Sequence, residues 1–272
     1  MKTQLACFVL TGEMFFGSVR LCNANDALAF WLESGATARI AFHLAGSQAA
    51  ELQIENNKLS VRLEPGTTQI LAENIEPLHG EILVQIDDFN FDGWRDIAVL
   101  ESYGYGGVNV FSAIYAYDTN ESTFKHLLTE SNIRADDDVR ELHADQRSGP
   151  RYYTSKYRFQ AGHPYLYRQA VQIGPELEKN TLYDAQGSIL KTAIVDQSQE
   201  LSELIPARRR VLAERAYLYH SPDEQSKTRG YVIRGDEVEL LDSAGDWDQW
   251  FLIRYRGKST IERWIKSENI FE

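Results

Sequence analysis

Cysteine is scarce in this chain, with only Cys7 and Cys22 among 272 residues. A framework of several disulfides is therefore excluded. The residues between the two cysteines are typical of a strand, a turn and a second strand, which can bring the sulfurs within bonding distance. We expect either a single Cys7–Cys22 disulfide, which implies an oxidising compartment, or two buried free thiols.

Long apolar runs and excess positive charge are also missing. No stretch approaches the roughly 18 uninterrupted apolar residues that a spanning helix needs, and 28 basic residues face 40 acidic ones, a net charge of −12. We therefore expect no membrane span and no nucleic-acid binding, and favour a basic protein as partner. The apolar segment after Lys2 is too short for a signal peptide, so Met1 is read as a cytosolic start or as a start that replaces a removed leader.

Enzyme signatures are weak in the sequence. The six histidines are scattered, and no zinc, nucleophile-elbow, phosphate-loop or dinucleotide motif occurs. The glycine-rich segment 104–107 lies between expected strands, so it reads as a loop and not as a phosphate site. We expect no enzyme, although the many carboxylates leave an unrecognised acid/base pair open.

Alternation of apolar and polar residues dominates the chain and predicts an all-β fold. Helical spacing is hard to find. We expect a β domain over 1–195, a polar linker over 196–214 and a compact β unit over 215–272. The clearest strands are expected at 59–64, 82–86, 97–100, 108–111, 113–117, 152–159, 166–173 and 188–195.

The sharpest motif begins at Asp88 and reads D-F-N-F-D-G-W-R-D, directly after an apolar strand. Oxygen-bearing side chains at alternate positions can converge on one cation, and calcium takes six to eight oxygen ligands. We predict a calcium site formed by the side chains of Asp88, Asn90, Asp92 and Asp96 and the backbone carbonyl of Trp94. The alternative is a metal-free loop in which these side chains accept hydrogen bonds from their own backbone.

The strand–loop–strand of residues 84–98 is similar to calcium loops of the FG-GAP/VCBS type. More narrowly, the chain resembles bacterial periplasmic proteins related to lysozyme inhibitors and secretion-system immunity proteins. The order of the segments 115–117, 147–152 and 157–159 adds to this resemblance, which covers 80–195 well and 1–80 loosely.

The five residues from Ser148 read S-G-P-R-Y and match the S-G-x-x-Y pattern of bacterial lysozyme inhibitors. The resemblance implies that Ser148, Gly149 and Tyr152 enter a muramidase cleft. Such a cleft presents a protonated acid and an ionised carboxylate, to which a serine hydroxyl can both donate and accept. Arg147 and Arg151 are expected to pair with cleft carboxylates. The alternative is an ordinary turn, with Tyr152 packing across the strands.

Residues 215–272 resemble a small bacterial SH3-like β-barrel, through the segments 217–219, 231–241, 250–255 and 264–266. Arg263 departs from the pattern, since glycine often precedes the last tryptophan. Such domains often bind cell-wall peptides, which implies an envelope setting.

The sequence therefore predicts a non-enzymatic immunity or inhibitor protein of the periplasm that blocks the active cleft of a peptidoglycan-degrading toxin or lysozyme. Calcium is the expected cofactor, and the muramidase-type hydrolase is the expected partner. The alternative is a peptidoglycan-binding module that uses the SH3-like domain.

Overall fold

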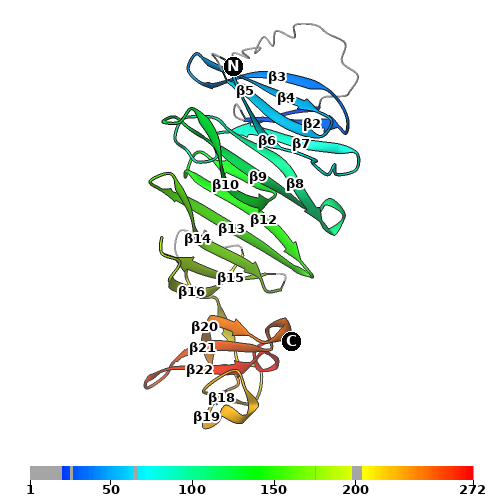
Figure 1. Cartoon of the computed structure of the whole chain (residues 1–272). Coiled ribbons are helices and arrows are strands. Elements are labelled where there is room, and N and C mark those ends of the chain that lie inside the picture. Colours follow the sequence, from blue (N-terminus) through cyan, green and yellow to red (C-terminus); the bar gives the residue numbers. More distant parts are fainter. Residues whose placement is uncertain (1–19, 25–26, 64–65, 175, 198–203, 272) are drawn as a thin grey trace, which may run out of the picture. The chain divides into compact units, whose positions relative to one another are not determined.

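The computed structural model describes residues 20–24, 27–63, 66–174, 176–197 and 204–271. These residues form four antiparallel sheets and no α-helix, which confirms the all-β prediction (Figure 1). They divide into two compact units. The first unit comprises the described residues up to Phe89 together with 93–102 and 112–129, and the second comprises 90–92, 103–111 and those from Glu130 onward.

The first unit holds a four-stranded sheet and most of a six-stranded sheet. The alternating side-chain directions of a strand put Ile82, Val84 and Ile86 of β7 on one buried face, within the apolar run 82–86 that predicted this strand. The four-stranded sheet comprises β3 (Ala38–Ala45), β4 (Gln48–Glu55), β5 (Lys58–Leu63) and β6 (Thr67–Ala72). The six-stranded sheet runs in the order β1 (Arg20–Ala24), β2 (Ala27–Glu33), β7 (Glu81–Asp87), β8 (Asp96–Gly104), β9 (Asn109–Asp118) and β10 (Thr123–Ser131).

Strand β9 differs from its prediction. The sequence predicted two strands, 108–111 and 113–117, whereas the structure forms one strand through the polar Ser112. Ser112 is buried inside that strand, so a single polar residue did not mark a strand end here.

The second unit holds two six-stranded sheets. The third sheet is a meander in sequence order, so each strand pairs with the next along the chain. It comprises β11 (Ile133–Asp136), β12 (Glu141–Ser148), β13 (Arg151–Gln160), β14 (His163–Gln172), β15 (Leu177–Tyr183) and β16 (Ile189–Asp196). The fourth, which we call the C-terminal sheet, runs in the order β17 (Arg208–Arg210), β20 (Glu237–Ala244), β21 (Trp250–Arg256), β22 (Thr260–Lys266), β18 (Arg215–Tyr219) and β19 (Lys227–Ile233). Four 3₁₀ turns complete the elements of the described residues: η1 (Tyr105–Gly107), η2 (Glu224–Ser226), η3 (Asp246–Asp248) and η4 (Ser267–Asn269).

The third sheet and the C-terminal sheet share one hydrophobic core. Leu177 and Ile194 of the third sheet belong to the same buried cluster as Leu240 and Phe251 of the C-terminal sheet. Ala207 joins the two sheets through its backbone, donating to the carbonyl of Ile194 at 2.7 Å and accepting from the N–H of Leu240 at 2.8 Å. The described part of the segment predicted as a linker therefore contains packed residues and β17. The predicted domain boundaries themselves stay a prediction.

Candidate functional site

The β12–β13 hairpin carries the S-G-x-x-Y motif at its tip. Ser148 pairs with Arg151, so Gly149 and Pro150 form a two-residue turn. Gly149 has φ 61°, and glycine with a positive φ at the first central position is typical of the type II′ turn that suits hairpins. Ser148, Gly149, Pro150 and Tyr152 are all exposed. The motif thus lies at an accessible end of the third sheet.

The strand pairing separates the predicted contact residues onto two faces. Arg147 lies opposite Tyr152, and Ser148 lies opposite Arg151. Since directly opposed residues share a face and neighbours along a strand alternate, Ser148 and Tyr152 point to opposite faces of the hairpin. The guanidinium of Arg147 lies 5.5 Å from the centroid of the Tyr152 ring, and its Nε donates to the carbonyl of Gly149 at 3.1 Å. A partner with a flat surface cannot contact both faces of the hairpin, whereas a partner with a cleft that encloses the hairpin end can.

The segment between β8 and β9 holds this hairpin from the side. The buried side chain of Asn109 bonds Arg147 twice, donating to its carbonyl and accepting from its N–H, each at 2.8 Å. Tyr105, with φ 51°, accepts the N–H of Gly149 at its phenolic oxygen at 2.8 Å. These bonds fix the backbone of the hairpin end.

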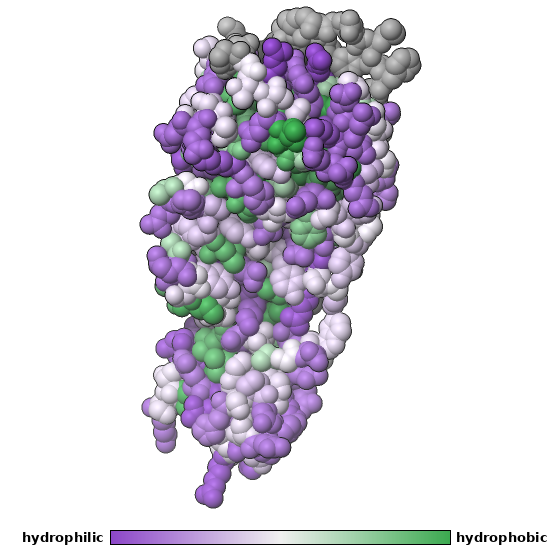
Figure 2. All heavy atoms as spheres, viewed as in Figure 1, coloured by the Kyte–Doolittle hydropathy of each residue, from purple (hydrophilic) through white to green (hydrophobic). Residues whose placement is uncertain are grey.

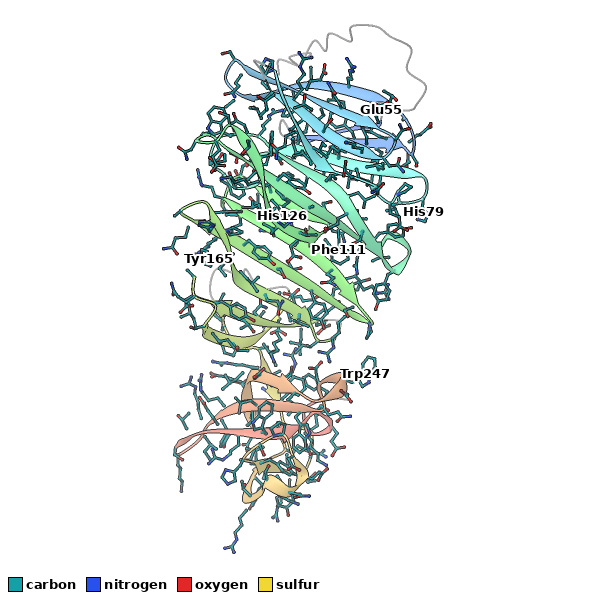
Figure 3. The ribbon with its side chains drawn as sticks, viewed as in Figure 1. Glu55, His79, Phe111, His126, Tyr165 and Trp247 are labelled. Carbon is teal, nitrogen blue, oxygen red and sulfur yellow. The ribbon has the colours of Figure 1, made fainter. Side chains whose placement is uncertain are left out.

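The C-terminal sheet contacts the same hairpin through η3. The guanidinium of Arg151 binds the carboxylate of Asp248, with Nη2 to Oδ2 at 2.9 Å. Trp247, next to Asp248, projects into solvent from this loop, on the side of the sheet nearest the hairpin end (Figure 3).

Large aromatic side chains at and beside the hairpin end are exposed. The exposed fractions are 58% for Tyr105, 52% for Tyr152 and 72% for Trp247. Hydrophilic residues predominate on the face shown in Figure 2, where hydrophobic side chains lie in separate small patches. Exposed aromatic residues of this size are typical anchors of protein interfaces.

The S-G-x-x-Y motif pointed to the residues at the hairpin tip, but the sequence did not indicate the residues that hold this tip. Tyr105 belongs to the segment 104–107, which the sequence indicates only as a glycine-rich loop, and Asn109 belongs to the expected strand 108–111. Asp248 lies 97 residues from its partner Arg151. The D-W-D segment around Trp247, an aromatic residue between two acidic ones after a glycine, was the available signal for an exposed turn.

The predicted calcium loop is hydrogen-bonded to its own backbone. Asp88 Oδ2 accepts the N–H of Gly93 at 2.8 Å, and Asn90 Oδ1 accepts the N–H of Asp92 at 3.0 Å. Asp96 is fully buried and accepts two backbone N–H groups, those of Phe89 at 3.0 Å and Tyr117 at 3.1 Å.

These contacts correspond to the metal-free alternative for this loop. Trp94, expected to lend its carbonyl, packs its ring against Tyr117 with centroids 5.3 Å apart. Within the described part of the chain, no three His, Cys, Asp or Glu side chains are grouped so that they could hold a metal ion. Calcium binding by this loop stays a prediction.

A charged network lies on strands β11 to β14 of the third sheet. The buried carboxylate of Glu141 accepts from Arg158 Nη2 at 2.8 Å and lies 3.4 Å from His143 Nε2. Burial raises the pKa of Glu141, but hydrogen bonds from Tyr167 and Arg158 outweigh it, and the pKa lies below its usual range.

His143 is neutral in this network. Arg134 Nη2 lies 2.9 Å from His143 Nδ1, and since arginine only donates, Nδ1 is the acceptor and Nε2 carries the proton. Burial lowers the pKa of His143, and the charges of Lys156 and Arg134 lower it further. The network therefore stabilises the sheet and does not offer a free acid or base.

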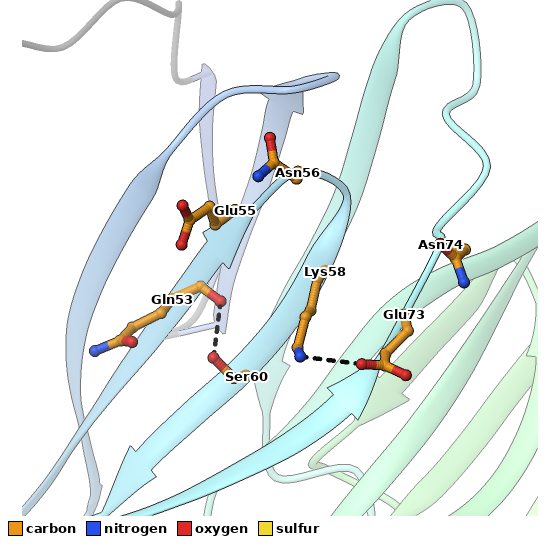
Figure 4. Close-up of a pocket in the computed structure, with 7 residues that line it drawn as sticks. All are labelled: Gln53, Glu55, Asn56, Lys58, Ser60, Glu73 and Asn74. Atoms are coloured by element: carbon orange, nitrogen blue, oxygen red, sulfur yellow. Dashed lines mark hydrogen bonds and ion pairs between the residues drawn. The ribbon is translucent and has the colours of Figure 1, made fainter.

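A polar hollow of about 500 Å³ lies on β4, β5 and β6 of the first unit (Figure 4). Its one ammonium group, on Lys58, is paired with Glu73 at 3.0 Å, and Ser60 Oγ donates to the carbonyl of Gln53 at 3.4 Å. No apolar or aromatic side chain lines it, so we assign it no ligand. Its lining is Gln53, Glu55, Asn56, Lys58, Ser60, Glu73 and Asn74.

Two further predictions concern the cysteines and the membrane. Cys7 lies outside the described residues, and of Cys22 the structure describes only the backbone, in β1, so the disulfide stays a prediction. Among the described residues, no helix has the length and apolar character that crossing a membrane requires.

Comparisons with known proteins assign no family. No protein-family model matches the chain, and no curated protein matches it. Among solved structures, that of a Xanthomonas type IV secretion system related protein aligns with 67% of this chain and 100% of its own, at 12% identity and a TM-score of 0.36. This similarity is too distant to assign a fold family or a function.

Proposed function

We propose that this protein is a non-enzymatic inhibitor of the immunity type, which places its β12–β13 hairpin in the active cleft of a peptidoglycan-degrading enzyme in the periplasm. The single observation that carries the proposal is the exposed hairpin end, with Ser148 and Tyr152 on opposite faces and its backbone held by Tyr105 and Asn109. A rigid protrusion with side chains on both faces suits a cleft. Binding also costs less when the protrusion is ordered beforehand.

The chemistry of the hairpin end suits a cleft that contains carboxyl groups. The Ser148 hydroxyl can donate to an ionised carboxylate and accept from a protonated one, as in the acid pair of a lysozyme-type site. Tyr152 offers a rigid aromatic surface. Arg147, whose contacts are to the Gly149 carbonyl and the Tyr152 ring, is the cation that can turn to a cleft carboxylate. Arg151 is already paired with Asp248 and is therefore a positioning residue.

The net charge of −12 supports the same partner class. The first 206 residues contain 16 basic and 28 acidic residues, so the whole net charge resides there. An acidic inhibitor is steered toward a basic hydrolase, which raises the association rate. This proposal requires no calcium.

The alternative function is peptidoglycan binding by the C-terminal sheet, where Tyr231 and Ile233 of β19 are exposed. Two cations lie over ring faces there: Lys227 Nζ is 3.6 Å from the Tyr217 centroid, and Arg215 Cζ is 4.3 Å from that of Tyr231. Since sugars stack on open ring faces, these cations disfavour glycan binding at this surface.

A pull-down with paired baits tests the proposal. The purified protein and its Ser148→Ala/Tyr152→Ala variant are exposed to lysate of the producing cell and to isolated peptidoglycan. We expect the parent to capture a cell-wall hydrolase and the variant to lose it. Capture of the same hydrolase by both baits would show that the hairpin is structural. Recovery of cell-wall fragments alone by both baits would favour the peptidoglycan-binding alternative.

A further inference from the structure

The ion pair between Arg151 and Asp248 joins the hairpin to the C-terminal sheet in a defined geometry. Two nitrogens of the guanidinium face two oxygens of the carboxylate, with Nη2–Oδ2 at 2.9 Å and Nη1–Oδ1 at 3.4 Å. The two side chains are only 26% and 13% exposed, so solvent screens this pair less than one on an open surface. Such a two-point contact fixes direction as well as distance.

The loop that carries Asp248 adopts an unusual backbone. Gly245, Trp247 and Asp248 all have positive φ, at 85°, 63° and 55°. Two consecutive residues other than glycine in the left-handed region are uncommon, and such conformations concentrate at functional sites. Here the conformation directs the Asp248 carboxylate to Arg151 while the Trp247 ring stays in solvent.

We propose that the loop 245–249 forms the second half of the surface that binds the hydrolase, with Asp248 positioning the hairpin and Trp247 acting as an aromatic anchor. This inference rests on the proposed function. Trp247 follows the exposed Asp246, and a tryptophan ring face beside a carboxylate attracts lysine or arginine side chains. The occupant is thus a basic hydrolase whose cleft carboxylates meet Arg147 and whose basic rim meets Trp247. The C-terminal sheet then acts in partner binding and not as a separate ligand module.

Hydrogen–deuterium exchange of the free, full-length protein tests the positioning role of Asp248 without any partner. Asp248→Asn removes the charge, and asparagine tolerates the left-handed backbone. We expect at least fivefold faster exchange in the peptide that covers 147–152, with no change in β20 and β21. Unchanged exchange at 147–152 would overturn the positioning role.

Binding of purified basic muramidases of the lysozyme type tests the role of Trp247. We expect Trp247→Asn to weaken binding at least tenfold with an unchanged melting temperature, and Trp247→Tyr to restore most of it. The matched control is Ile189→Ala, at an exposed apolar side chain in β16, which should bind like the parent. Parent-like binding by Trp247→Asn would overturn this role. If the parent binds no muramidase while exchange still responds to Asp248→Asn, the proposed function and the Trp247 anchor fail together, and only the positioning role remains.

Discussion

The phenolic oxygen of Tyr105 accepts the backbone N–H of Gly149 at 2.8 Å, so a side chain 44 residues earlier in the chain holds the turn of the hairpin. Both residues are exposed, and water can replace the hydroxyl when it is removed. The bond therefore contributes more to order at the hairpin tip than to global stability.

Replacing Tyr105 with phenylalanine tests this relationship. We expect the free energy of unfolding to change by less than about 1 kcal/mol, while amide exchange at 148–151 becomes faster. Urea unfolding and hydrogen–deuterium exchange measure the two effects. Tyr231→Phe, which removes an exposed phenol from β19, is the control and should leave the hairpin unaffected. Equal hairpin exchange in all three proteins would contradict a holding role for Tyr105.

The calcium prediction is tested by titration of the full-length protein. If the motif from Asp88 to Asp96 binds calcium, millimolar calcium should raise the melting temperature, by the linkage of binding to folding. Asp92→Ala should abolish the rise and the calorimetric heat. If the parent shows neither heat nor a shift in melting temperature, the loop does not bind calcium. Its acidic and amide side chains then serve only the hydrogen bonds made by Asp88, Asn90 and Asp96.

Stability should fall in mild acid because of His143. Its folded pKa lies below the usual 6.5, because burial and the nearby Lys156 and Arg134 disfavour the charged ring. As the pH falls below 6.5 the unfolded chain binds this proton first, so the free energy of unfolding decreases, by at most about 1.4 kcal/mol per pH unit. Glu141, whose folded pKa is also lowered, adds a further loss below about pH 4.3, the ordinary value for glutamate.

Urea unfolding at pH 7, 6 and 5 measures this dependence. His143→Gln should flatten the slope between pH 6.5 and 5. The matched control is His126→Gln, which makes the same replacement at an exposed histidine of β10. A slope that survives His143→Gln would assign the acid sensitivity to other groups.

The shared core predicts that the third sheet and the C-terminal sheet unfold together. Ile194→Ala removes a fully buried side chain from this core and should cost about 2–5 kcal/mol. Protection from hydrogen exchange should fall in β14 to β16 and also in β20 and β21. Leu190→Ala, at an exposed position of the same strand, should cost little. Loss of protection in the third sheet alone would show that the two sheets fold independently.

The sequence predicted those strands and turns that depend on neighbouring residues along the chain. The short apolar run 82–86 identified β7, and the S-G-x-x-Y motif singled out the residues that lie at the hairpin tip. Tyr105 contacts Gly149 across 44 residues of sequence, and Arg151 contacts Asp248 across 97. No periodicity in the sequence indicates contacts between residues so far apart. At Asp96 the ambiguity is chemical, because a carboxylate that binds a cation and one that accepts two backbone N–H groups look identical in a sequence.

The most direct test of the inhibitor role is a titration of the captured hydrolase with the purified protein, measured as the rate of lysis of a cell-wall suspension. We predict loss of activity near a one-to-one ratio, and at least a 100-fold weaker effect for Ser148→Ala/Tyr152→Ala. Full hydrolase activity in excess parent protein, or equal inhibition by parent and variant, would contradict the inhibitor role.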